Sequence, residues 1–283
     1  ETGTALALEL VLVSSLAFHP KAHELKGHPG QITSAAAVRE ALDGSGLADR
    51  GNAKGRIIQD PYSLRCAPHV LGAARDALSW AETLLGRELN SVNDNPMVDP
   101  DSGTVLFAGN FYGGHVALGM DLLKTAAASV ADLLDRQYAL LLDSRLNMGL
   151  PETLVAYEGC GLKALQLTTS ALTARCIQRS APDTTLSRPT EVHNQDKVSM
   201  GLNAALSAAE VVDLLQQVLA TQLVALSNAA SLRAESALAM PARALLSKVR
   251  SHSAVLERDR RLDGDLRRIH VAICDGSLLS GSH

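Results

Sequence analysis

The sequence is poor in aromatic residues, and this shortage bears on its fold class. Only 3% of its 283 residues are aromatic, and the 46% that are hydrophobic are mostly alanine and leucine. Alanine and leucine favour helices, whereas strands draw on valine, isoleucine, tyrosine and phenylalanine. The composition therefore predicts an all-α protein, and its length is sufficient for a large buried core.

Cysteine and net charge are also scarce. The four cysteines, Cys66, Cys160, Cys176 and Cys274, lie far apart and form no CxxC pair. That spacing suits neither a zinc site nor a disulfide-rich secreted domain, and it favours reduced thiols in a cytoplasmic protein. A net charge of −4 provides no overall field for nucleic acid or anionic lipid, so neither is expected as a partner.

The first 20 residues are apolar, yet they make a poor signal peptide and a poor membrane span. No lysine or arginine precedes the apolar stretch, and Glu9 interrupts it. It is also too short and too polar to cross a bilayer. The sequence does not start with methionine, so we expect a vector remnant or the cut edge of a longer protein here. A buried helix that continues from an upstream part is the resulting prediction.

Helical periodicity and breaker residues divide the chain into three parts. These are an N-terminal helix-and-loop segment (1–64), a central bundle of long helices (65–240) and a tail of short helices (241–283). The helix-forming stretch 116–142 is apolar on more than one face, which predicts burial in a large bundle or an oligomer interface. The helices are expected at 65–89, 116–142, 151–179, 198–238, 242–257 and 263–275.

The last expected helix is rich in charge. Five arginines between 258 and 268 alternate with aspartates, a mixture typical of a solvated, ion-paired surface. We therefore expect an exposed helix there.

The segment 59–65, Gln-Asp-Pro-Tyr-Ser-Leu-Arg, combines side chains able to bind and to react. Pro61 fixes the backbone ahead of a helix, and the Tyr62 phenol can give or take a proton. Arg65 can hold a carboxylate with a two-pronged hydrogen bond. The alternative is a loop before a helix whose arginine forms a surface ion pair.

Three further polar segments lie at helix ends. In 88–96, the density of Asn93, Asp94 and Asn95 favours turns that cap their own backbone. In 109–115, glycines permit close approach to a ligand or another chain, Asn110 offers an amide, and Phe111 offers an aromatic wall. In 193–196, His-Asn-Gln-Asp, Asp196 is expected to be the N-cap of the next helix.

A metal site is a weaker alternative. His19 and His23 have a spacing usable for zinc on a helix, with His28 nearby. Pro20 follows the first histidine directly, and no nearby cysteine or carboxylate pair completes the set. No metal is therefore expected.

Taken together and in this order, the segments resemble one family. The chain is similar to the histidine, phenylalanine and tyrosine ammonia-lyases and their aminomutase relatives. The shared strings are HPGQ at 28–31, QDPYSLR at 59–65, ELNSVNDNP at 88–96, GNF at 109–111 and HNQD at 193–196. The resemblance implies an ammonia-lyase-like helical bundle that forms part of an oligomer.

The resemblance also implies a role for each matching residue. Tyr62 corresponds to a tyrosine at the reaction centre, and Arg65 to an arginine that grips the substrate carboxylate, with Gln59 on the same loop. Asn110 and Phe111 match residues that line the site near the electrophile. Gln195 stands where histidine lyases have a glutamate, so a phenyl or hydroxyphenyl substrate is expected rather than imidazole. The choice between phenylalanine and tyrosine, and between lyase and aminomutase, stays open.

Family members carry a methylideneimidazolone electrophile made from an internal Ala-Ser-Gly, and this sequence contains no such tripeptide. The string Asp-Gly-Ser-Gly at 43–46 sits in the wrong context. The resemblance therefore implies an upstream half, on the same or a separate chain, within a tetramer whose sites combine several chains. We expect this chain alone to be inactive. The alternative is a helical scaffold or regulatory partner without catalysis.

Overall fold

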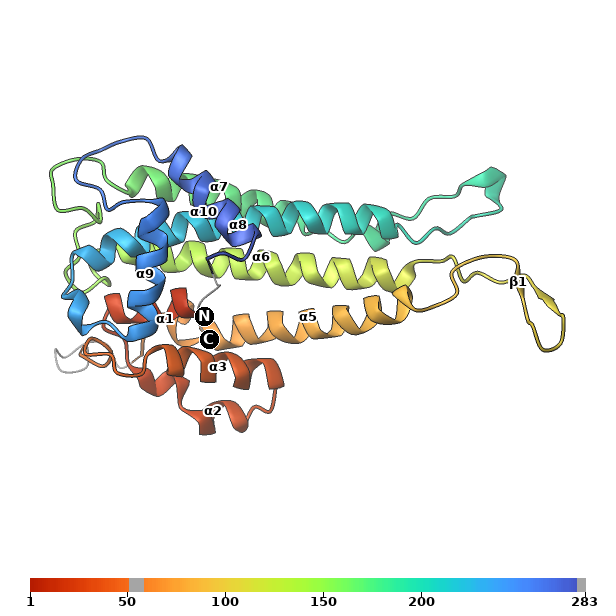
Figure 1. Cartoon of the computed structure of the whole chain (residues 1–283), viewed down its shortest axis with the longest axis horizontal. Helices are drawn as coiled ribbons and strands as arrows, with labels where there is room; N and C mark the ends of the chain where they lie inside the picture. Colours follow the sequence, from red (N-terminus) through yellow and green to blue (C-terminus); the bar gives the residue numbers. More distant parts are fainter. Residues whose placement is uncertain (51–58, 279–283) are drawn as a thin grey trace.

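The computed structural model describes residues 1–50 and 59–278, and these form a long bundle of helices (Figure 1). The helices are α1 (Thr2–Leu10), α2 (Pro20–Glu24), α3 (Pro29–Ala41), α4 (Tyr62–Arg65), α5 (Ala67–Leu89), α6 (Gly114–Leu142), α7 (Lys163–Arg179), α8 (Gly201–Ser231), α9 (Met240–His252) and α10 (Asp263–Cys274). Two short strands, β1 (Met97–Val98) and β2 (Val105–Leu106), pair antiparallel in the loop between α5 and α6. The prediction of an all-α protein is confirmed.

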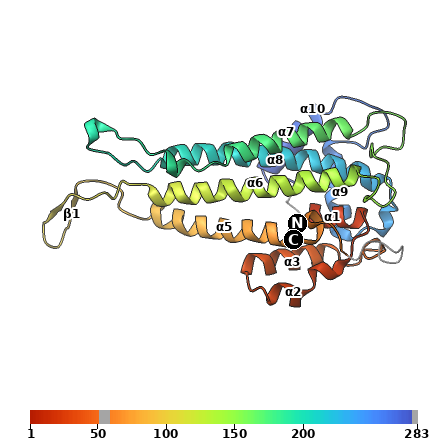
Figure 2. The ribbon, with the colours of Figure 1, turned by 180° about the vertical axis from the view of Figure 1, so that it is seen from behind.

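The long helices α5, α6, α7 and α8 lie side by side, with α6 in contact with each of the other three (Figures 1 and 2). Small residues allow this close approach, because an alanine seam on α6 meets branched side chains on α8. The seam and its partners form one buried cluster: Ala127, Ala128, Ala131, Leu134, Cys176, Val211, Leu214 and Val218. The burial predicted for the stretch 116–142, which forms α6, is confirmed, since many of its residues on several faces are buried.

Shorter helices gather at one end of the bundle, which we call the packed end (α1, α3, α9, α10 and the halves of α6 and α8 beside them) (Figure 1). Every residue of α1 from Thr4 to Leu10 is buried there, so the predicted buried N-terminal helix is confirmed. By length and composition α8 alone among the described helices could cross a membrane, although 56% of its most apolar window is buried inside the bundle.

The predicted helix from Pro151 to Arg179 is wrong in its first third, because the structure begins the helix only at Lys163. The preceding segment is drawn into turns around one carboxylate. Asp259 accepts hydrogen bonds from the Tyr157 hydroxyl at 2.7 Å and from the backbone amides of Cys160 and Gly161 at 2.9 Å. Gly161 has a φ of +54°, a conformation that helix interiors exclude.

The predicted helix 198–238 is shorter at both ends, since α8 spans Gly201–Ser231. Met200 adopts a left-handed backbone with φ 61°, which prevents the helix from beginning earlier. Asp196 is therefore not the N-cap, and that prediction is wrong. The tail helices are confirmed as α9 and α10, with α9 shifted to Met240–His252.

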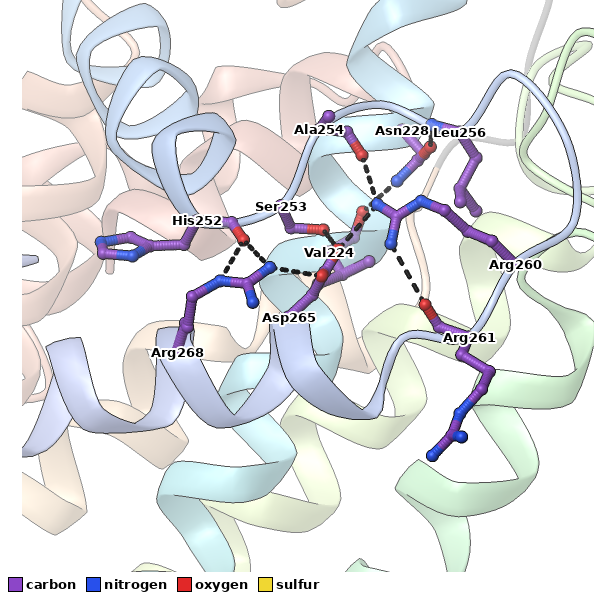
Figure 3. A network of polar contacts seen from close by, with 10 residues as sticks. All are labelled: Val224, Asn228, His252, Ser253, Ala254, Leu256, Arg260, Arg261, Asp265 and Arg268. Carbon is purple, nitrogen blue, oxygen red and sulfur yellow. Dashed lines mark hydrogen bonds and ion pairs between the residues drawn. The ribbon is translucent and has the colours of Figure 1, made fainter.

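The charged helix α10 is not simply exposed, because Asp265, Ile269 and Ala272 are buried. Asp265 accepts from Ser253 Oγ at 2.8 Å and forms ion pairs with Arg260 at 2.6 Å and Arg268 at 2.5 Å (Figure 3). The predicted solvated, ion-paired surface is confirmed for the arginines, which are all exposed, as in the pair of Arg261 with Asp263. Arg260 and Arg268 join α10 to the end of α9 through the buried Asp265 carboxylate.

Candidate active site

The predicted residues Gln59, Tyr62 and Arg65 lie together at the start of the bundle, and we call them the Tyr62 platform. Pro61 is the N-cap of the single-turn helix α4 and adopts an extended backbone there. The Arg65 guanidinium donates to the Asp60 carbonyl at 2.8 Å and to Gln59 Oε1 at 3.0 Å. Its carbon Cζ lies 4.5 Å from the centroid of the Tyr62 ring. Hydrogen bonds and a cation–π contact thus fix the arginine.

The platform faces outward. The Tyr62 side chain is 71% exposed, although Leu64, two residues on, is fully buried. One turn beyond Arg65, burial lowers the pKa of His69, and the neighbouring His23 lowers it further. His23 uses both ring nitrogens, one near the Ala17 carbonyl at 3.0 Å and one near the Gln31 amide at 2.9 Å. His23 therefore has no nitrogen left for a zinc ion, and no metal-binding cluster occurs among the described residues.

Asn110, Phe111 and Gln195 lie together at the opposite end of the bundle, and we call them the end-loop cluster. Gln195 pairs with Thr190 through the backbone, and its Oε1 accepts from the Thr190 hydroxyl at 3.0 Å. Phe111 is 52% exposed. Both border a hollow of about 310 Å³ whose lining is Gly109, Phe111, Tyr112 and residues 194–199. Tyr112 was not singled out from the sequence, although it directly follows the matching string.

The asparagines predicted to cap turns stabilise the loop between α5 and α6, which carries Asn110 and Phe111. Asn93 Nδ2 donates to the Glu88 carbonyl at 3.0 Å, and Asn95 Oδ1 accepts from the Ala108 amide at 2.8 Å. Asn110 Nδ2 in turn donates to the Val92 carbonyl at 3.2 Å. The loop thus orders itself by its own polar side chains, as the sequence indicates.

A buried ion cluster anchors the second loop, which carries Gln195. Lys124 on α6 is fully buried and donates to Asp121 at 2.8 Å, to Asp183, and to the Ala181 carbonyl at 2.8 Å. Asp121 also accepts from the backbone amides of Asp183 and Thr184, both at 2.9 Å. Burial opposes the lysine charge, but the bonds to the two aspartates outweigh it, so the pKa of Lys124 is raised. Sequence reasoning missed Lys124, although a lysine within an apolar helix was a usable signal.

Within one chain the two groups do not meet. The Tyr62 platform lies beside residues Ser129 to Arg136 of α6, with which Tyr62 lines a shallow hollow. Asn110 and Phe111 precede the first residue of α6, Gly114. A helix rises 1.5 Å per residue, so the groups are separated by about 25–30 Å along α6. One chain therefore brings three of the predicted residues together at each end, but not all six.

The fold is that of the ammonia-lyases and aminomutases. The chain superposes on phenylalanine aminomutase from Pantoea agglomerans with a TM-score of 0.90 at 30% identity, covering 96% of this chain and 56% of that one. For tyrosine aminomutase from Streptomyces globisporus the TM-score is 0.91 at 32% identity, with coverage of 98% and 57%.

The sequence comparison leads to the same class. Residues 1–251 match the family described as aromatic amino acid lyase. A histidine ammonia-lyase of Anaeromyxobacter sp. (strain K) is 36% identical over 277 residues, covering 97% of this chain and 54% of that protein. The chain belongs to the aromatic amino acid lyase family, and it spans about half the length of the curated relatives it matches.

Proposed function

We propose that this chain provides the substrate-clamping and aromatic-binding parts of an enzyme that eliminates ammonia from an aromatic amino acid. The observation that carries the proposal is the Tyr62 platform, where a reactive phenol stacks on an arginine already held in place. Family membership supports the reaction class, since the relatives are ammonia-lyases and aminomutases.

The platform suits two chemical tasks. Arg65 uses Nε and one Nη2 hydrogen for bonds within its own loop, and its remaining donors can bind a substrate carboxylate. The Tyr62 hydroxyl, at the exposed end of its ring, can then take or return a proton near the β-carbon of a substrate held this way. A fixed clamp and an adjacent phenol orient the reaction without further rearrangement.

The end-loop cluster suits the aromatic end of a substrate. Phe111 supplies an apolar wall, and Gln195 supplies a neutral amide in the same hollow. A neutral amide offers no counter-charge to an imidazolium, which favours phenylalanine or tyrosine over histidine. The sequence relatives named above are nevertheless histidine ammonia-lyases, so histidine is the competing substrate.

The family's methylideneimidazolone would supply the electrophile that activates the amine. The chain lacks the Ala-Ser-Gly from which it forms, so we propose that another segment or chain contributes it. The side chains here fit such a contribution, since Tyr62, Phe111 and the adjacent Asn110 are exposed. Nδ2 of Asn110 is engaged by Val92 and Met97, and among the described residues its side-chain oxygen is left to accept. No metal is required by this scheme.

Assembly follows from the separation of the two groups. Because about 25–30 Å of α6 lies between them, a complete site needs surfaces from more than one chain. We therefore propose a tetramer, as the resemblance implies, containing the upstream half of the enzyme. We place it in the cytoplasm, in keeping with four dispersed cysteines that are free in the described structure.

The proposal is tested by expressing this chain with and without an upstream half that carries Ala-Ser-Gly. Phenylalanine, tyrosine and histidine are supplied separately, and the unsaturated acid is followed by absorbance while β-amino acids are followed by chromatography. Product only when both parts are present supports the divided enzyme. A β-amino acid identifies an aminomutase, and the absence of any product favours the scaffold alternative.

A matched pair of variants tests the two ends of the site. Arg65→Met is expected to lower kcat/KM by about a hundredfold or more, because it removes a charge-assisted clamp. Gln195→Glu is expected to shift the preference toward histidine while leaving Arg65 intact. Equal losses for all three substrates in Gln195→Glu would remove this residue from substrate selection.

A further inference from the structure

A buried glutamine on α6 lies directly beneath the Tyr62 platform. Gln137 has no exposed surface, and its Nε2 donates to the carbonyl of Ser63 at 3.0 Å. Ser63 is the residue that follows Tyr62 in α4. This hydrogen bond joins the rigid core of the long bundle to a four-residue helix that carries an exposed functional side chain.

In the described part of the chain, no backbone amide donates to the Ser63 carbonyl. Helix α4 ends at Arg65 and α5 begins at Ala67, so the ladder of helical hydrogen bonds is interrupted at Cys66. The bonds of α4 run from Arg65 N to Pro61 O and from Cys66 N to Tyr62 O, and the ladder stops there. The next amide in register, that of Ala67, makes no backbone bond to the Ser63 carbonyl among the described residues, and Pro68 after it has no N–H. The Gln137 amide supplies the missing donor.

The orientation of the Gln137 amide is also fixed. Its Oε1 accepts from Nε2 of Gln222 on α8 at 2.8 Å, and the Thr4 hydroxyl lies 3.3 Å from Nε2. Gln222 is fully buried as well. The Ser63 carbonyl can only accept, so the amide nitrogen must face it, and Oε1 accepts from the Thr4 hydroxyl as well as from Gln222. Helices α1, α6 and α8 thus converge on one amide, which presents its donor to α4.

Tyr62 depends on its backbone for direction. In the described part of the chain its side chain contacts Arg65 by stacking, and its hydroxyl has no hydrogen-bond partner. Arg65, in contrast, has its own bonds to Asp60 and Gln59. A shift of the Ser63 peptide would therefore redirect the phenol more than the guanidinium.

We propose that Gln137 is a positioning residue for the reaction: it fixes the Ser63 carbonyl and thereby the direction in which Tyr62 points. This inference rests on the proposed function, in which Tyr62 handles the proton. Gln137 touches neither substrate nor electrophile. Its effect reaches the reacting atoms through one backbone bond and one side chain.

The test compares two buried glutamines of the same network in the enzyme assembled with its upstream half. Gln137→Met removes the donor to Ser63 while keeping a similar volume, whereas Gln222→Met removes a buried amide and leaves the Ser63 bond in place. Gln137→Met is expected to lower kcat by about tenfold to a hundredfold, with KM within about twofold, since a displacement of about 1 Å costs rates of this order. Gln222→Met should keep kcat within about twofold.

Hydrogen–deuterium exchange on the same assemblies gives a readout independent of turnover. The amides of Leu64, Arg65 and Cys66, which close α4, should exchange faster in Gln137→Met and at the wild-type rate in Gln222→Met. Equal kcat losses in both variants, or unchanged exchange at α4, would overturn the inference. If the wild-type assembly forms no product, the proposed function fails, while the exchange experiment still decides whether Gln137 holds α4.

Discussion

The two halves of α8 differ sharply in their surroundings. From Ala220 to Ala230 every residue is buried, including the polar ones. From Gly201 to Leu219 burial is restricted to one stripe, formed by Ala204, Ala208, Val211, Leu214 and Val218. The C-terminal half (220–230) crosses the packed end, where α1, α9 and α10 cover it. The N-terminal half (201–219) projects toward the end loops (Figure 1).

Apolar side chains remain uncovered along the projecting part of the bundle. They are Leu78 and Trp80 on α5, Leu118 on α6, and Leu202, Leu206 and Val212 on α8. Apolar surface of this extent is typical of protein interfaces. The packed end thus completes its own core within one chain. The projecting end carries three of the six predicted site residues beside this apolar surface, which supports the assembly proposed above.

The largest effect is expected at the buried ion cluster of the projecting end. Lys124→Met removes the cation from between Asp121 and Asp183 and leaves two buried carboxylates facing each other. We expect the free energy of unfolding to fall by about 4 kcal/mol, the usual cost of breaking a buried pair. Urea denaturation measures it. Lys163→Met, which removes an exposed pair with Glu152, is the control and should cost less than about 1 kcal/mol.

The Lys124 variant also tests the order of the loop that carries Gln195, because the ion cluster anchors that loop. If Lys124→Met were no more harmful than Lys163→Met, the projecting end would have no rigid element of its own. Its loops would then depend entirely on neighbouring chains for their order.

A second test uses two leucines on α8, one in each half. Leu226 is fully buried, so Leu226→Ala should destabilise the chain by about 3 kcal/mol through lost burial and the cavity left behind. Leu206 is 64% exposed, and Leu206→Ala should change the stability by less than about 0.5 kcal/mol. Sedimentation of the assembled protein should show weaker association for Leu206→Ala than for Leu226→Ala. Unchanged association would mean that this surface faces solvent.

The sequence predicted the long helices well, because helical periodicity carries that information. The predicted helix starts at Pro151 and at Asp196 were wrong, because distant contacts or an unusual backbone conformation determine where these two helices begin. The turn at 151–161 depends on Asp259, about a hundred residues away, and the start of α8 depends on a left-handed Met200. The split of the site was also invisible, since the order of motifs along a chain does not give their distance in space.

The smallest effects are expected from two buried carboxylates of the packed end, which should respond to pH with opposite signs. Glu9 is fully buried; one oxygen accepts from the Ala239 amide at 2.7 Å and the other has no partner among the described residues. Burial raises the pKa of Glu9, and the hydrogen bond from Ala239, the nearby Ser45 and the charge of Arg243 only partly offset it. Asp265 is desolvated too, but its bonds to Arg260 and Ser253 outweigh that effect and lower the pKa of Asp265.

A raised pKa means that the folded state binds the proton more tightly than the unfolded one. The Glu9 contribution is therefore fully present below the unfolded value of about 4.3 and is lost as the pH rises through the raised pKa. The Asp265 contribution is present above about pH 3.9 and is lost as the pH falls through its lowered pKa.

Relative to wild type, Glu9→Gln should gain about 2 °C in melting temperature between pH 4 and pH 8. Asp265→Asn should instead make the melting temperature depend less on pH below about pH 4. A Glu9→Gln difference that stays constant with pH would show that water reaches this carboxylate, and the packed end would then be less dry than its burial indicates.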